Sequence, residues 1–190
     1  MLRRLAIRGR EIQMTRSEVY KLIHGERDYQ ASQWHWDGHG YGIYLTYMDH
    51  YLREAVDGKS KMDVCRDKHW LHAGAAIRKF AALAVGAMEE NGLLYPSEPP
   101  ARDWVYAAID EEYQRCQPSW PILWAPQEFP EELTLLRHYL RLAEAAWTTE
   151  TDDSAVLNVI LKLAVIAVRC LETYGAPTRS RKVELSGSNS

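Results

Sequence analysis

The sequence has few cysteines: its 190 residues include only Cys65, Cys116 and Cys170. Small secreted domains rely on dense disulfide frameworks, and three scattered cysteines are too few to build one. Cys116 and Cys170 fall in segments with helical patterns, where a cysteine packs as a small apolar residue. This cysteine content is typical of a reducing compartment and predicts a cytoplasmic protein.

Long apolar runs are also missing. The longest, from Ala73 to Met88, is interrupted by Arg78 and Lys79, and a bilayer span needs roughly 20 apolar residues. The segment Met1 to Arg10 begins as a signal peptide does but lacks the apolar middle, and Met14 is an alternative start. We therefore expect a soluble chain with no membrane partner.

The chain has little net charge, −3 at pH 7, and few motifs that carry chemistry by themselves. This charge gives no general attraction to nucleic acid or anionic lipid. Both ends are locally basic, but no continuous basic face follows, so nucleic-acid binding is not expected. There is no Gly-rich phosphate loop and no nucleophile elbow. The pairs His35/His39 and His69/His72 have metal-compatible spacing but lack a clear third ligand.

What the sequence does contain is an internal repeat. Residue types in three blocks of the first half return in the same order in the second, at offsets of 86, 88 and 83 residues. The repeated pairs include Val19/Val105, Tyr20/Tyr106, Glu26/Glu112, Trp34/Trp120, His50/His138, Arg53/Arg141, Lys79/Lys162, Glu89/Glu172 and Gly92/Gly175. Three blocks in register are difficult to obtain by chance, so the pattern predicts two copies of one structural unit.

Each half is predicted to form three helices. Apolar residues recur at i, i+3, i+4 and i+7, and no strand-like alternation competes. Asp57-Gly58 is expected to end the second helix, and Gly92 and Gly175 to end the third helix of each half with left-handed backbone. The expected helices span residues 16–33, 43–56 and 67–91, then 101–117, 130–147 and 154–174.

One apolar stripe per helix leaves a face of a three-helix unit uncovered, and two such units can cover each other. We therefore predict an all-α fold, a tandem repeat of a three-helix unit forming an internal pseudo-dimer with a central four-helix bundle. The expected divisions are a basic N-terminal extension (1–15), a first repeat (16–93), a Pro-rich linker (94–101), a diverged second repeat (102–176) and a disordered tail (177–190).

Two acidic residues, Glu26 and Glu112, are predicted on inward helix faces because each follows apolar positions by three and seven residues. A buried carboxylate is costly unless it is paired. Arg53 and Lys79, both repeated, are available partners. A structural ion pair in each half is the simplest interpretation, and a metal or nucleotide-phosphate site is the functional one. Trp34 closes the first helix as a hydrophobic lid or as a base-stacking ring.

Several segments of the first half form a recognisable pattern. They are Glu26-Arg27-Asp28-Tyr29-Gln30, Trp34, Tyr51-Leu52-Arg53-Glu54-Ala55, Ile77-Arg78-Lys79-Phe80-Ala81-Ala82-Leu83-Ala84-Val85 and Met88-Glu89-Glu90-Asn91-Gly92. Together they resemble the MazG-like, all-α nucleotide pyrophosphohydrolase superfamily, and are most similar to its small phage and bacterial members. The resemblance covers about residues 17 to 92, and the second half is a diverged copy.

The resemblance implies an enzyme that splits a (d)NTP into a (d)NMP and pyrophosphate. It also implies Mg²⁺ held by carboxylates from two central helices, because Mg²⁺ prefers oxygen ligands and bridges substrate phosphates. The implied residues are Glu54 and Asp49 for catalysis and metal binding, Glu26 and Glu89 as further metal ligands, and Lys79, Arg53 and Trp34 for substrate binding.

The chain also departs from the family's pattern, which is Glu-x-x-Glu on one helix facing a Glu or Asp pair on the next. Here Asp49 and Glu54 are five residues apart, and the next helix begins its inward face with Gly74, Ala75 and Ala76. The alternative function is therefore a catalytically degenerate member that binds a nucleotide or serves as an interaction or assembly module. A homo-oligomer is compatible with either.

Overall fold

The computed structural model describes residues 13–33, 40–62, 66–92, 102–119, 128–149 and 153–179, and within these ranges it is all-helical. The helices are α1 (Arg16–Gln33), α2 (Tyr41–Met62), α3 (Arg66–Asn91), α4 (Arg102–Ser119), α6 (Phe129–Thr149) and α7 (Asp153–Tyr174). The predicted all-α class is confirmed for this part of the chain.

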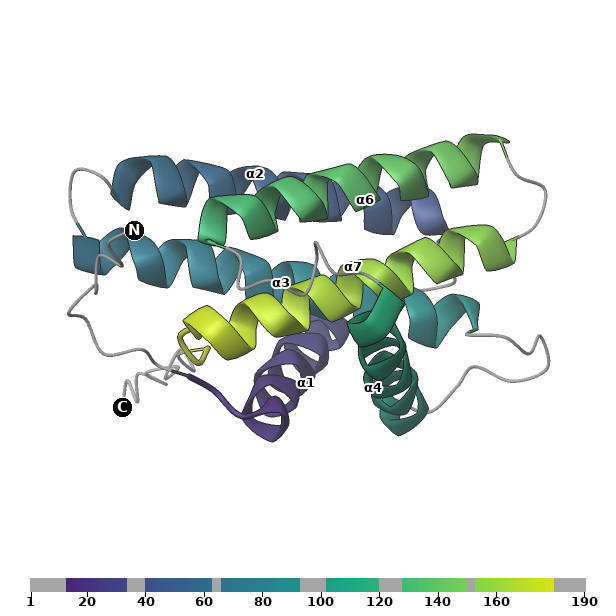
Figure 1. Ribbon diagram of the computed structural model, residues 1–190, viewed down its shortest axis with the longest axis horizontal. Coiled ribbons are helices and arrows are strands. Elements are labelled where there is room, and N and C mark those ends of the chain that lie inside the picture. The colour runs from purple at the N-terminus through teal and green to yellow at the C-terminus, as the bar shows by residue number, and fades with distance from the viewer. Residues whose placement is uncertain are drawn as a thin grey trace, which may run out of the picture.

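The long helices are arranged in layers. Figure 1 shows α2 and α6 in an upper layer, α3 and α7 below them, and α1 and α4 crossing underneath. α2 packs on α3 and α6 packs on α7, and the two pairs meet where α3 contacts α7 and α2 contacts α6. α1 contacts both α3 and α7, and α4 contacts the same two helices. α3 and α7 therefore lie at the centre of the molecule.

The apolar stripes expected on α3 and α7 form the core. Small alanines within these stripes allow the two helices to pack closely against each other. All of the predicted stripe residues are buried: Ile77, Phe80, Ala81, Ala84, Val85, Met88, Ile160, Leu163, Ala164, Ala167, Val168 and Leu171.

Glycine plays different roles at three helix positions. Gly92 and Gly175 have φ angles of 80° and 73°, which confirms the predicted left-handed ends of α3 and α7. The expected end of the second helix at Gly58 is wrong, because α2 continues to Met62. A Cβ at Gly58 would lie 3.1 Å from the backbone nitrogen of Ala73, so this glycine permits close packing of α2 on α3. The other predicted helix ends lie within two residues of the observed ones.

α7 is long and apolar enough to cross a membrane by length and composition, with a mean hydropathy of 2.0 over its best window. The expectation that no segment reaches this length was therefore wrong for α7. However, 61% of that window is buried inside the protein, and α7 contacts α1, α3, α4 and α6. Core helices of soluble proteins meet the same criteria, so α7 is weak evidence for a membrane span.

Candidate functional site

Three of the predicted site residues meet around Tyr51. Glu26 lies on α1, Glu54 on α2 and Lys79 on α3. The Lys79 Nζ atom is 4.7 Å from the centroid of the Tyr51 ring and 3.5 Å from Glu54 Oε2. Burial raises the pKa of Tyr51, and the nearby charges of Glu54 and Glu26 raise it further. We name this group, with its neighbours, the Tyr51 cluster: Glu26, Tyr29, Tyr51, Glu54, Arg78, Lys79 and Arg179.

Glu26 is the most deeply buried acid of the Tyr51 cluster, with 2% of its surface exposed. Arg78 Nε and Nη2 each lie 3.1 Å from Glu26 Oε2, and Arg179 Nη1 donates to Oε1 over 2.8 Å. The predicted burial of Glu26 is confirmed, but its partners are these two arginines and not Lys79 or Arg53. Burial lowers the pKa of Arg78, while the charge of Glu26 opposes that shift.

The residues after α7 complete the Tyr51 cluster, and we call residues 175–179 the C-terminal strap. A Cβ on Gly74 of α3 would lie 3.0 Å from the carbonyl oxygen of Gly175, so the strap passes directly over the α3 backbone. Arg78 donates to the carbonyl oxygen of Pro177. The Arg179 guanidinium carbon lies 3.0 Å from the centroid of the Tyr29 ring. Pro177 and Arg179 were both assigned from sequence to the tail. Pro177 contacts α3, and Arg179 contacts α1.

Glu54 and Asp49 have different partners. Glu54 accepts from Lys79 and lies 3.6 Å from His50 Nε2, and its side chain is 30% exposed. Asp49 pairs with Arg53, whose side chain is 75% exposed. Five residues on an α-helix correspond to a rotation of about 140° about the axis, which explains why the two carboxylates do not face one ligand.

Glu89 lies away from the Tyr51 cluster, since ten residues on α3 separate it from Lys79, about 15 Å along the axis. Its Oε2 accepts from Arg27 Nε over 2.8 Å and its Oε1 from Arg102 Nε over 2.5 Å. Arg102 also pairs with Asp28 over 2.7 Å. Gly86 makes room for this arrangement, because a Cβ there would lie 2.7 Å from the Arg27 guanidinium carbon.

The carboxylates that the structure describes do not fit Mg²⁺ as they are arranged. No group of three or more His, Cys, Asp or Glu side chains that could hold a metal ion occurs among the described residues. Glu26 and Glu89 each accept from arginine at both oxygens. Mg²⁺ needs near-octahedral oxygen ligands at about 2.1 Å, and these oxygens already face cations. Trp34, the remaining predicted site residue, lies outside the described ranges.

The second half also buries its repeated glutamate, but with different partners. Glu112 is 4% exposed, as predicted, and accepts from Arg115 Nε over 2.8 Å and from the Cys116 thiol over 3.4 Å. Burial, followed by this hydrogen bond, raises the pKa of Cys116 to about 11. The position equivalent to Arg78 is Leu161, so the arrangement around Glu26 is specific to the first half.

Sequence reasoning did not assign a site role to four members of the Tyr51 cluster: Tyr29, Tyr51, Arg78 and Arg179. Arg78 had a signal, because it directly precedes Lys79 within the helix packed on α1. Arg179 had none, since nothing local indicates that a chain segment beyond a helix-ending glycine will return to α1.

A scan against protein-family models and searches of curated proteins and of solved structures gave no match.

Proposed function

We propose that the chain is a MazG-like helical protein that binds a nucleotide at the Tyr51 cluster without cleaving it. The observation that carries this proposal is the pairing of each predicted metal ligand with a cation of the protein. Arg78 and Arg179 pair with Glu26, Arg27 and Arg102 with Glu89, Lys79 with Glu54, and Arg53 with Asp49.

The buried pairs support a structural role for Glu26 and Glu89. The side chains of Arg27 and Arg78 are each 5% exposed. Freeing Glu26 to bind a metal would leave the buried Arg78 guanidinium without its carboxylate, and breaking a buried pair typically costs about 3–5 kcal/mol. Freeing Glu89 would leave Arg27 with the longer 3.4 Å ion pair to Glu90. These two carboxylates are therefore better suited to holding α1 against α3 than to holding Mg²⁺.

The more exposed part of the Tyr51 cluster supports nucleotide binding. The side chains of Lys79 and Arg179 are 28% and 34% exposed. Each lies over an aromatic ring, Lys79 over Tyr51 and Arg179 over Tyr29. Lysine and arginine are the usual phosphate-binding side chains, and aromatic faces stack on bases. The resemblance of residues 17 to 92 to nucleotide pyrophosphohydrolases indicates the same ligand class.

A pyrophosphohydrolase is the second candidate, and the loose contacts of Glu54 favour it. Its carboxylate lies 3.5 Å from Lys79 and 3.6 Å from His50, longer than good charge-assisted bonds. Glu54 therefore loses little by turning to another partner. In this alternative Glu54 would be the central Mg²⁺ ligand.

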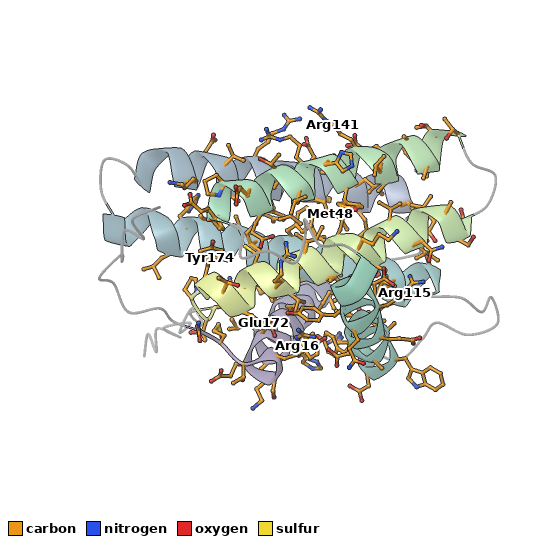
Figure 2. All side chains as sticks on the ribbon, viewed as in Figure 1. Arg16, Met48, Arg115, Arg141, Glu172 and Tyr174 are labelled. Atoms are coloured by element: carbon orange, nitrogen blue, oxygen red, sulfur yellow. The ribbon has the colours of Figure 1, made fainter. Side chains whose placement is uncertain are left out.

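We also propose that the fold is a tandem repeat forming an internal pseudo-dimer, and contacts exchanged between the halves support it. Arg16 on α1 pairs with Glu172 on α7 over 2.6 Å, and Arg102, 86 residues later, pairs with Glu89 on α3 over 2.5 Å. Figure 2 labels Arg16 and Glu172 side by side below α7. The repeated Tyr20 and Tyr106 stack with centroids 4.4 Å apart. A two-fold relation produces such reciprocal contacts.

The test is calorimetric binding of a panel of dNTPs, with and without Mg²⁺, beside an assay for pyrophosphate release. We expect the wild-type chain to bind a nucleotide without releasing pyrophosphate, and Lys79→Gln to bind at least about tenfold more weakly. Arg141→Gln is the matched control, because Arg141 is exposed on α6 (Figure 2), and no member of the Tyr51 cluster lies on that helix.

Two results would change the assignment. Pyrophosphate release by the wild-type chain that is abolished in Glu54→Gln would establish the enzyme. A folded chain that neither binds nor hydrolyses any nucleotide would contradict both candidates and leave the interaction or assembly alternative.

A further inference from the structure

The C-terminal strap changes the charge of the Tyr51 cluster. Without it, the carboxylates of Glu26 and Glu54 balance the cations of Arg78 and Lys79. Arg179 adds a third cation, which leaves the cluster with one positive charge in excess. A partly buried excess charge is unfavourable unless an opposite charge lies nearby, so this arrangement favours an anion.

The three cations differ in how far a ligand can reach them. Arg78 is enclosed, since it donates to both Glu26 and the carbonyl oxygen of Pro177 and its side chain is 5% exposed. Arg179 is held by one carboxylate oxygen and one ring face, and a third of its side chain remains exposed. Arg179 therefore has donors that can reach a ligand, whereas Arg78 serves to fix Glu26 and the strap.

The position of Arg179 is set by the backbone of the strap. The left-handed Gly175 ends α7 and turns the chain over α3. Gly74 accepts this crossing because it has no side chain: a Cβ there would lie 3.0 Å from the Gly175 oxygen and 3.2 Å from the Ala176 Cα atom. Both are backbone atoms that cannot rotate away. Gly74 and Gly175 are thus the two positions that allow Arg179 to reach α1.

We propose that Arg179 is a phosphate-binding residue, carried to the Tyr51 cluster by the C-terminal strap, and that it binds the phosphate chain of the nucleotide together with Lys79. This inference rests on the proposed nucleotide binding. The planar guanidinium can bind two phosphate oxygens at once, and Glu26 and Tyr29 hold it in place in the absence of a ligand.

The experiment uses the full chain with inorganic tripolyphosphate and with a dNTP that the wild-type protein binds. We expect Arg179→Gln to weaken tripolyphosphate binding at least about tenfold, and Arg179→Lys to weaken it less because the charge remains. Gly74→Ala should weaken binding in the same direction, although Gly74 itself would not touch the ligand. Arg141→Gln should bind as the wild-type chain does.

Thermal unfolding of each variant reports whether it is folded. A second readout is the NMR signal of the Arg179 side-chain Nε–H group, which should shift when tripolyphosphate is added.

The outcomes separate this inference from the proposed function. If the wild-type chain binds the dNTP and Arg179→Gln binds it and tripolyphosphate equally well, the role of Arg179 is overturned and nucleotide binding stands. An Nε–H signal that does not move at saturating tripolyphosphate would overturn that role as well. If the wild-type chain binds neither the dNTP nor tripolyphosphate, both proposals fail.

Discussion

At the scale of single residues, burial decides what an acidic side chain does in this protein. Glu26 and Glu54 belong to the same cluster, but the Glu26 side chain is 3% exposed and that of Glu54 is 30% exposed. The buried carboxylate of Glu26 is needed most by Arg78, whose side chain is 5% exposed and would otherwise be a desolvated cation. The partly exposed ion pair of Glu54 with Lys79 is screened by water and contributes little to stability.

Replacement of Glu26 by alanine should therefore lower the free energy of unfolding by about 3–5 kcal/mol, because Arg78 would be left buried without its carboxylate. Glu54→Ala, the control, should change it by less than about 1 kcal/mol. Urea unfolding at neutral pH measures both, and equal losses would contradict the difference in role. Replacing Arg78 by methionine in the Glu26→Ala background should recover part of the loss.

The thiol of Cys116 gives a pH-dependent prediction. Its pKa in the folded chain is raised from 9.0 to about 11, first by burial and then by the hydrogen bond to Glu112. The protonated thiol is favoured in the fold, so its contribution to stability is complete below pH 9 and is lost as the pH rises through 11.

The free energy of unfolding should consequently fall more steeply between pH 9 and 11 in the wild-type chain than in Cys116→Ala. Identical slopes would contradict the shift. Peptide mapping after alkylation at pH 8 should also find Cys116 slow to react, since only about a thousandth of it is thiolate at that pH.

At the scale of the helices, identical residues have different effects according to what faces them. Gly25 and Gly58 both lie inside helices. A Cβ on Gly25 would meet nothing within 4 Å, whereas one on Gly58 would crowd the backbone of Ala73. Helix propensity favours alanine at both positions by roughly 1 kcal/mol, and only packing separates them.

We expect Gly25→Ala to raise the free energy of unfolding by about 0.5–1 kcal/mol. The free energy of unfolding of Gly58→Ala should be lower than that of Gly25→Ala. That of Gly58→Val should be clearly lower than that of the wild-type chain, because α2 must move away from α3 to make room for the side chain. Thermal and urea unfolding of the three variants test the order. If both alanine variants gain the same stability, the close approach of α2 to α3 does not restrict the side chain at position 58.

At the scale of the whole molecule, the two halves of the chain share one interior. α3 packs on α7 and α2 packs on α6, and the exchanged pairs Arg16–Glu172 and Arg102–Glu89 tie each half to the other. Helices that bury their apolar stripes against the other half are not expected to be stable alone, so unfolding should be cooperative across the chain.

The energetic coupling between the two halves can be measured at the stacked pair Tyr20 and Tyr106. A double-mutant cycle with Tyr20→Leu and Tyr106→Leu should give an interaction free energy of about 0.5–1.5 kcal/mol, as for other aromatic pairs in contact. A cycle of Tyr20→Leu with Tyr139→Leu is the control, because Tyr139 lies on α6 in the upper layer, whereas α1 crosses underneath α3 and α7 (Figure 1). Coupling near zero in the first cycle would argue against a rigid junction between α1 and α4.

The amino-acid sequence by itself determined the helical class, most helix ends and the buried stripes. These features depend on residues close together in the chain: the periodicity of α3 and α7, and the left-handed glycines Gly92 and Gly175. The burial of Glu26 and Glu112 followed from the spacing of apolar residues on α1 and α4.

Only the tertiary structure decided which charges meet. The pairing of Glu26 with Arg78 and Arg179, the two arginines on Glu89 and the continuation of α2 through Gly58 all depend on contacts between segments distant in sequence. Local periodicity places a side chain on a face, but the partner on the opposite face is set by how the helices and the strap cross. For that reason the arrangement of charges at the Tyr51 cluster depends on the three-dimensional fold and cannot be derived from local sequence.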